Sequence, residues 1–162
     1  MACTCEKKSQ SLHASPGLVE DREFLIRIVF KPEMIDAEGN LKNSAIPSSD
    51  LERQVEGEPP YRGYSVFREG HSTAEQLQIA AKILASRKTD RESAWSFRCL
   101  TKDVRALLAD DGFRSLCVVD RATCDNTAHA EMWGGRPGRS KAALKNIRDQ
   151  LVTLLTPVAQ IM

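Results

Sequence analysis

The stretch from residue 94 to residue 120 constrains the fold most, because the spacing of its apolar side chains changes twice within a short length. Residues 94–100 alternate as a strand does, residues 101–112 have the period of a short helix, and residues 115–120 are apolar and β-branched, as in a buried strand. Only a few residues connect the three segments. This order predicts one βαβ-like unit at 94–120, with a right-handed crossover between its strands.

Three further segments have the pattern of strands. Residues 22–30 carry apolar side chains on both faces, and residues 63–69 follow a long loop-like stretch at 43–62. In residues 127–133, small apolar side chains alternate with larger polar ones. Together with the two strands of the βαβ-like unit, these segments predict a sheet of about five strands.

Two longer segments have the pattern of amphipathic helices. In residues 72–88, Ser72 and Glu75 have the spacing of a capping box. Residues 140–155 begin with Ser140 as a helix cap. Their apolar face consists of Leu144, Ile147, Leu151, Leu154 and Leu155. With the short helix of the βαβ-like unit, three helices pack on the sheet, so the predicted fold class is α+β, or mixed α/β.

The length of 162 residues and the hydrophobic content of 41% fit one domain with a packed core. We expect residues 21–158 to form this single globular domain. Residues 1–20 have few apolar side chains and no period, so we expect a disordered leader there. The net charge of +1 gives no general attraction to nucleic acid. The sequence lacks an apolar run suited to a membrane helix or a signal peptide, which predicts a soluble, cytoplasmic protein without membrane contact.

The five cysteines argue against a disulfide framework, because their number is odd and no export signal is apparent. Cys3, Cys5 and His13 contain ligand types that zinc prefers, but their spacing is not typical of a zinc site. We therefore expect neither a metal nor a cofactor, and we leave open whether these three residues bind an ion. Cys99 and Cys117 lie within apolar runs and are expected to be buried.

The segment from residue 124 to residue 141 holds the first candidate site. On a strand at 127–133, the side chains of His129, Glu131 and Trp133 share one face. A histidine with a carboxylate two positions away has the residue types of a general base and its orienting partner. The same pair also fits a hydrogen-bonded structural contact. His129 and Glu131 are therefore the candidate catalytic residues, and Trp133 is a candidate ligand contact.

A second set of candidates is basic. Arg136, Arg139 and Lys141 lie where a glycine-rich turn opens the last helix, and backbone N–H groups at a helix start can bind an anion. The turn does not match the phosphate-loop pattern, and a solvated helix start explains it equally. Arg68 ends the strand at 63–69, where it can hold a carboxylate or phosphate, or pair with a nearby acid.

The sequence resembles a loose group of small bacterial proteins without an established activity. The resemblance lies in an S-V-F-R strand and in a late H-A-x-[IM]-x-G segment ahead of a final helix, and it covers roughly residues 24–155. The matching residues are Ser65, Val66, Phe67, Arg68, His129, Ala130 and Gly134. Glu131 departs from the asparagine common in the group. The resemblance implies bacterial origin and a shared fold, and no mechanism.

Two classes of function follow from these observations. A small accessory or partner-binding protein is favoured, because no complete catalytic motif is present and the charge is balanced. Its partner would be another protein, or a small anionic ligand. The alternative is a small hydrolase or transferase for a phosphorylated or nucleotide-like ligand, with His129 as the acid–base group and Arg68 as the anion clamp. Whether the protein is an enzyme stays open. Convergence of Arg68, His129 and the turn at 134–141 in one pocket would favour the enzyme.

Overall fold

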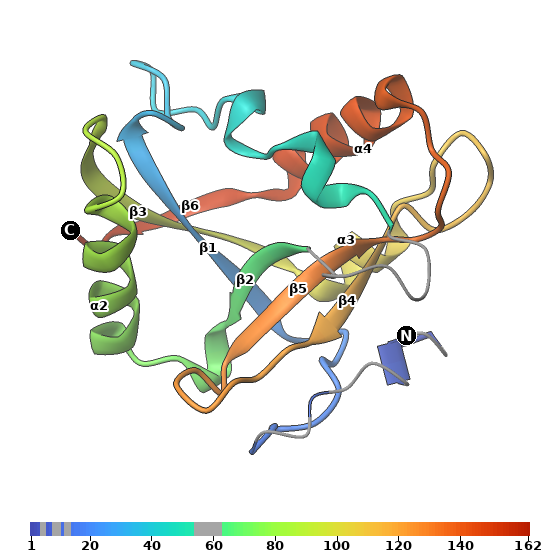
Figure 1. Cartoon of the computed structure of the whole chain (residues 1–162), viewed down its shortest axis with the longest axis horizontal. Coiled ribbons are helices and arrows are strands. Elements are labelled where there is room, and N and C mark those ends of the chain that lie inside the picture. The colour runs from blue at the N-terminus through green and yellow to red at the C-terminus, as the bar shows by residue number, and fades with distance from the viewer. Residues whose placement is uncertain (4–5, 8–10, 12–13, 54–62) are drawn as a thin grey trace.

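The computed structural model describes residues 1–3, 6–7, 11, 14–53 and 63–162, and within them six strands form one antiparallel sheet (Figure 1). The strand order is β4-β5-β2-β1-β3-β6. The strands are β1 (Phe24–Pro32), β2 (Tyr64–Arg68), β3 (Arg91–Leu100), β4 (Leu116–Asp120), β5 (His129–Gly134) and β6 (Thr156–Gln160). The helices are α2 (Ala74–Ala85), α3 (Thr101–Ala106) and α4 (Lys141–Leu154), with short 3-10 helices η1 (Asn43–Ala45), η2 (Ser48–Leu51) and η3 (Glu69–His71). The predicted α+β class is confirmed.

The βαβ-like unit differs from the predicted crossover. Every neighbouring pair in the sheet is antiparallel, so β3 and β4, four positions apart in the strand order, run in the same direction. However, β1, β2 and β5 lie between them, and β3 and β4 do not pair. The local pattern of strand, helix and strand was therefore correct, whereas the pairing of the strands depends on segments far away in the sequence.

The prediction of about five strands missed β6, which pairs with β3 at one edge of the sheet. All five residues of β6 are exposed, and Pro157 interrupts its pattern of backbone donors. An exposed segment with a proline does not have the pattern of a buried strand, so the sequence did not predict it. At the edge of a sheet, however, a proline is tolerated. β4 forms the other edge, although it is buried along its whole length.

The helices lie where the sequence predicts them, with different ends. The capping box of α2 uses Thr73 and Gln76, one residue beyond the predicted pair. The α3 helix ends at Ala106, earlier than predicted, and Gly112 instead adopts a positive φ of 80° in the following turn. The α4 helix begins after Ser140, whose hydroxyl accepts a hydrogen bond from the backbone N–H of Ala143. It packs against η1, η2 and α3, whereas α2 packs against β1 and β3.

The described parts of residues 1–20 contact the edge of the sheet at β4 (Figure 1). The Glu6 carboxylate is buried, accepts a hydrogen bond from the Val118 backbone N–H at 2.8 Å and pairs with Arg105 at 3.1 Å. Val19 is also buried. At these residues the structure differs from the predicted disordered leader. The segment covers the edge of β4, and the Glu6–Arg105 ion pair and the hydrogen bond from the Val118 N–H hold it there. Within the described part of the chain, no helix is long and apolar enough to cross a membrane.

Candidate functional site

A cavity of about 550 Å³ lies between α2 and the sheet, and we call it the α2 hollow. It is bounded by β1, β2, the C-terminal half of α2 and the start of β5. Its apolar lining consists of Ile28, Phe30, Met34, Phe67, Ala80, Ile83 and Leu84. Ile83 is more than half exposed, so apolar surface remains open to solvent beside the cavity. A cavity of this size with an apolar lining suits a small organic group.

Basic side chains surround the apolar lining. Arg27, Arg87, Lys88 and Arg91 all line the α2 hollow. Glu33 pairs with two of them, at 2.6 Å from Lys88 and 2.5 Å from Arg91. Burial raises the pKa of Glu33, but the hydrogen bonds from these two cations outweigh it and lower the pKa, so this acid stays charged. One carboxylate therefore neutralises only one of the two cations that it pairs with. As a result, the side chains around the hollow carry an excess of positive charge.

Arg27 is fixed at the edge of the hollow by its own contacts. One of its NH1 hydrogens is donated to the backbone carbonyl of Ser65 at 2.7 Å, and its guanidinium lies 4.3 Å from the centre of the Tyr64 ring. The Arg27 Nε is buried and has no hydrogen-bond partner among the described residues. A buried donor without a partner is costly, and a bound acceptor would remove that cost.

Arg87 differs from the other cations of the hollow. It follows the last turn of α2, is exposed, and forms no ion pair with any acid of the described chain. Asp50 is the acidic residue among those that line the hollow, and it forms no ion pair with Arg87. Arg87 is therefore a positive charge that is available to a ligand entering the hollow from solvent.

His129 also lines the α2 hollow, next to Ser65. Its Nδ1 lies 2.9 Å from the backbone carbonyl oxygen of Arg121, an acceptor only, so the hydrogen bond requires the proton on Nδ1. The neutral ring then presents Nε2 as an acceptor, 3.3 Å from the hydroxyl of Ser65. A hydroxyl that donates to a correctly oriented imidazole is the first element of a serine nucleophile.

Glu131 does not orient His129. Its carboxylate accepts a hydrogen bond from Trp133 Nε1 at 3.1 Å and lies 3.8 Å from Arg121. Trp133 is buried, and a Cβ at Gly63 would lie 2.4 Å from its indole ring. Glu131 and Trp133 therefore form a packed structural pair, and the carbonyl of Arg121 takes the orienting position that the sequence assigned to Glu131.

Arg68 lies outside the hollow and is saturated by protein partners. Its guanidinium donates to both carboxylate oxygens of Glu23 at 2.8 Å, and to the backbone carbonyls of Gly17 and Leu18. It also lies 3.6 Å from Asp120, and its side chain is only 2% exposed. Arg68 therefore holds segments of the protein together, and no donor on it is left for an anionic ligand.

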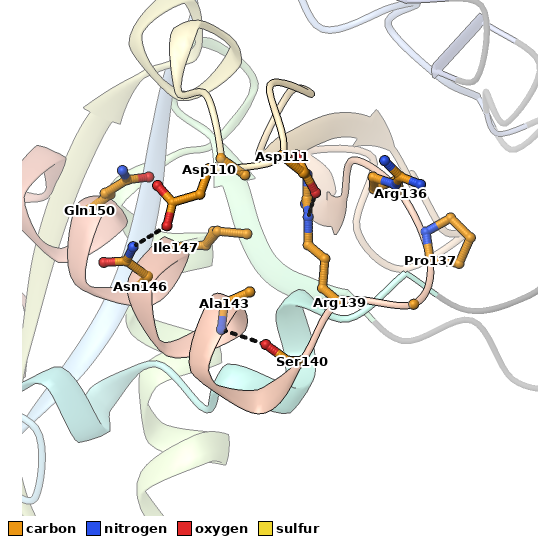
Figure 2. Close-up of a pocket in the computed structure, with 12 residues that line it drawn as sticks. Asp110, Asp111, Arg136, Pro137, Arg139, Ser140, Ala143, Asn146, Ile147 and Gln150 are labelled. Atoms are coloured by element: carbon orange, nitrogen blue, oxygen red, sulfur yellow. Dashed lines mark hydrogen bonds and ion pairs between the residues drawn. The ribbon is translucent and has the colours of Figure 1, made fainter.

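The turn at 134–141 borders a different cavity, of about 470 Å³ (Figure 2). Arg139 pairs with Asp111 at 3.1 Å and donates to the carbonyls of Ser115 and Arg114. Its hydrogen bond lowers the pKa of Asp111. Arg136 lies over the ring of Phe113. These contacts hold the turn in place. They also occupy Arg136 and Arg139, two of the basic side chains that the sequence suggested for binding an anion.

Two further residues of this turn have structural explanations. Lys141 is exposed in the first turn of α4 and does not line the cavity. At Gly135, a Cβ would lie 1.8 Å from the carbonyl oxygen of Arg114, so only glycine permits this close approach. Arg68, His129 and the turn at 134–141 therefore lie in three separate places, and the predicted anion crevice does not form.

Five polar residues of the α2 hollow were not among the candidate site residues from the sequence: Arg27, Ser65, Arg87, Lys88 and Arg91. Arg27 offered a signal, because it interrupts the apolar run of β1. Ser65 belongs to the S-V-F-R strand of the resemblance, but only the register of the strands places it beside His129. Arg87 offered no signal, since it meets the hollow only through the end of α2.

Metal-ligating side chains gather elsewhere, at β4. Among the residues that the structure describes, Cys3, Glu6 and Cys117 form the group whose ligand atoms lie close enough to share an ion, within 4.8 Å of one another. Cys5 and His13, the other residues considered from the sequence, lie outside the described residues.

Comparisons with known protein families, with curated proteins and with solved structures gave no significant match. The resemblance to the group of small bacterial proteins therefore stays a prediction, and the functional argument depends on the geometry of the α2 hollow alone.

Proposed function

We propose that the protein is a non-catalytic binding protein, and that the α2 hollow takes an anionic group attached to an apolar body. The observation that carries this proposal is the combination of an apolar lining with four basic side chains, of which Arg87 has no acidic partner in the described chain. A carboxylate or a phosphate would meet Arg27 and Arg87, and its apolar body would cover Ile83 and Phe67.

The separation of the predicted catalytic residues supports binding over catalysis. Glu131 and Arg68 are committed to structural contacts, so the proposed acid–base pair and anion clamp are not available to one ligand. Bacterial origin, cytoplasmic location and the identity of the partner stay predictions.

The binding test uses octanoate as a carboxylate with an apolar chain, followed by NMR of the amide groups. We expect the largest shift changes at Ser65, Arg87 and His129. Octanol, which has no charge, and inorganic phosphate, which has no apolar body, should both bind more weakly. Shift changes confined to other parts of the protein, or none with octanoate, would overturn the proposal.

The same chemistry can come from a protein partner, because an acidic side chain next to apolar ones presents a carboxylate and an apolar body. A short peptide in which glutamate alternates with leucine is therefore the second probe. Tighter binding of the peptide than of octanoate assigns the hollow to a partner protein, and the reverse assigns it to a small molecule.

A second candidate function is hydrolysis, favoured by the contact of 3.3 Å between the Ser65 hydroxyl and His129 Nε2. In that case Ser65 is the nucleophile and His129 the base. An ester of octanoate separates the two functions. Release of the alcohol by the wild type, lost in Ser65→Ala while octanoate still binds, would favour the hydrolase. No release by the wild type favours the binding protein.

A further inference from the structure

Cys3 and Cys117 lie against each other, although 114 positions separate them in the sequence. Their sulfur atoms are 3.6 Å apart. Cys117 belongs to β4 and is buried with Val119 and Trp133, and Cys3 covers this cluster from the N-terminal segment. The α2 hollow uses neither cysteine, so their close approach is not explained by the proposed function.

We propose that Cys3 and Cys117 bind one zinc ion as thiolates, with Glu6 as a third ligand. Two thiolates on a tetrahedral zinc ion, each about 2.3 Å from the metal, have sulfur atoms about 3.8 Å apart. The observed 3.6 Å is close to this separation. A disulfide would instead require the sulfur atoms to approach to about 2.05 Å. The present spacing therefore accommodates an ion with less movement than a covalent bond.

Glu6 is already fixed beside the two thiols. It accepts hydrogen bonds from the backbone N–H of Cys3 at 2.9 Å and of Val118 at 2.8 Å. Its Oε1 accepts the short bond from Val118, and the further bonds to the same oxygen from Arg105 and Arg114, at 3.3 and 3.4 Å, are long. This oxygen can exchange a weak hydrogen bond for a metal bond, and a water molecule would take the fourth position.

The charge of the cluster is compatible with a divalent cation despite the two arginines. Zinc binding releases the protons of both thiols, so a charge of +2 replaces two protons and the net charge does not change. The ion pair between Glu6 and Arg105 can therefore persist. The bound ion would join the N-terminal segment to the edge strand β4 and add its binding free energy to the stability of this contact.

The test uses the full chain, reduced and freed of metal. Addition of cobalt(II), a spectroscopic substitute for zinc, should produce the ultraviolet absorption of cobalt–thiolate bonds, and zinc should abolish it at one ion per chain. Cys3→Ser should weaken binding by more than the roughly 10–100-fold that loss of a supporting hydrogen bond costs. Because Cys3 is partly exposed, this variant should fold even if Cys117→Ser does not.

Cys124→Ser is the matched control, since Cys124 is exposed and outside the cluster. Cys124→Ser should bind zinc as the wild type does. Absence of the cobalt–thiolate absorption in the wild type, or unchanged absorption in Cys3→Ser, would overturn the proposal. Formation of a disulfide between Cys3 and Cys117 in air, without zinc binding by the reduced protein, would also overturn it.

Discussion

Arg68 and His129 lie on opposite faces of the ladder between β2 and β5. Phe67 is the residue that pairs with His129, and Arg68 is one position further along the strand. Successive side chains of a strand point to opposite faces, so the imidazole faces the α2 hollow while the guanidinium faces Glu23 and Asp120. One position in the register therefore separates the two residues that the sequence suggested as partners.

The first prediction concerns Arg68 as a structural residue. Arg68→Ala should lower the free energy of unfolding by about 3–5 kcal/mol, because it leaves two carboxylates without their buried partner. Arg22→Ala is the control, since the Arg22 side chain is 86% exposed and its loss should change stability by less than about 0.5 kcal/mol. Unfolding in urea measures both. A loss under about 1 kcal/mol for Arg68→Ala would contradict its structural role.

The second prediction concerns acid. Burial raises the pKa of Glu23, but the hydrogen bonds from Arg68 and from the Glu20 backbone outweigh burial, so the pKa lies below its ordinary value of 4.5. The charged carboxylate thus stabilises the folded state above pH 4.5, and this contribution is lost as the pH falls through the lowered value.

Glu23→Gln removes this titration. The wild type and the variant should differ most in unfolding free energy near about pH 7, and the difference should shrink toward about pH 3. Glu20→Gln, at an exposed position, serves as the control. A difference between wild type and Glu23→Gln that is the same at both pH values would show that Glu23 does not stabilise the protein through its charge.

The third prediction concerns the packing of α4. Leu151 is completely buried, so Leu151→Ala should cost about 2–5 kcal/mol through lost burial and the cavity that it leaves. Leu108→Ala makes the same change at a position that is 63% exposed, and it should cost far less. Equal losses in urea unfolding would show that α4 is not packed against the core as described.

The elements that sequence patterns predicted correctly are those with a strong period and a buried face, such as α4 and β4. The position of β4 in the sheet was not predicted, however. The sequence predicted a buried strand at residues 115–120, and β4 is buried although it lies at an edge of the sheet. Leu116 and Val118 belong to the main core, whereas Cys117 and Val119 pack with Trp133 and are covered by Cys3 of the N-terminal segment. This segment is fixed to β4 through Glu6, a charged residue in a polar stretch.

The candidate site was predicted only at His129. Its actual neighbours come from strand register and from the end of α2, because Ser65 pairs with Glu131 on the adjacent strand and Arg87 follows the helix. Spacing along the sequence shows which side chains share a face of one strand, but it does not show which strand lies beside it. The sequence placed Glu131 and Trp133 on one face of the same strand, but it predicted contact with a ligand there and not the hydrogen bond between them.

The affinity of octanoate for two charge variants of the same helix region tests the binding function most directly. Arg87→Gln removes the cation at the hollow that has no acidic partner in the described chain, and Lys82→Gln removes an exposed cation of α2 that does not line the hollow. Binding should weaken about two- to fivefold in Arg87→Gln, as expected for one partly exposed charge pair, and added salt should reduce the difference. Lys82→Gln should bind as the wild type does. Equal affinities of the two variants would contradict the assignment of the α2 hollow as the binding site.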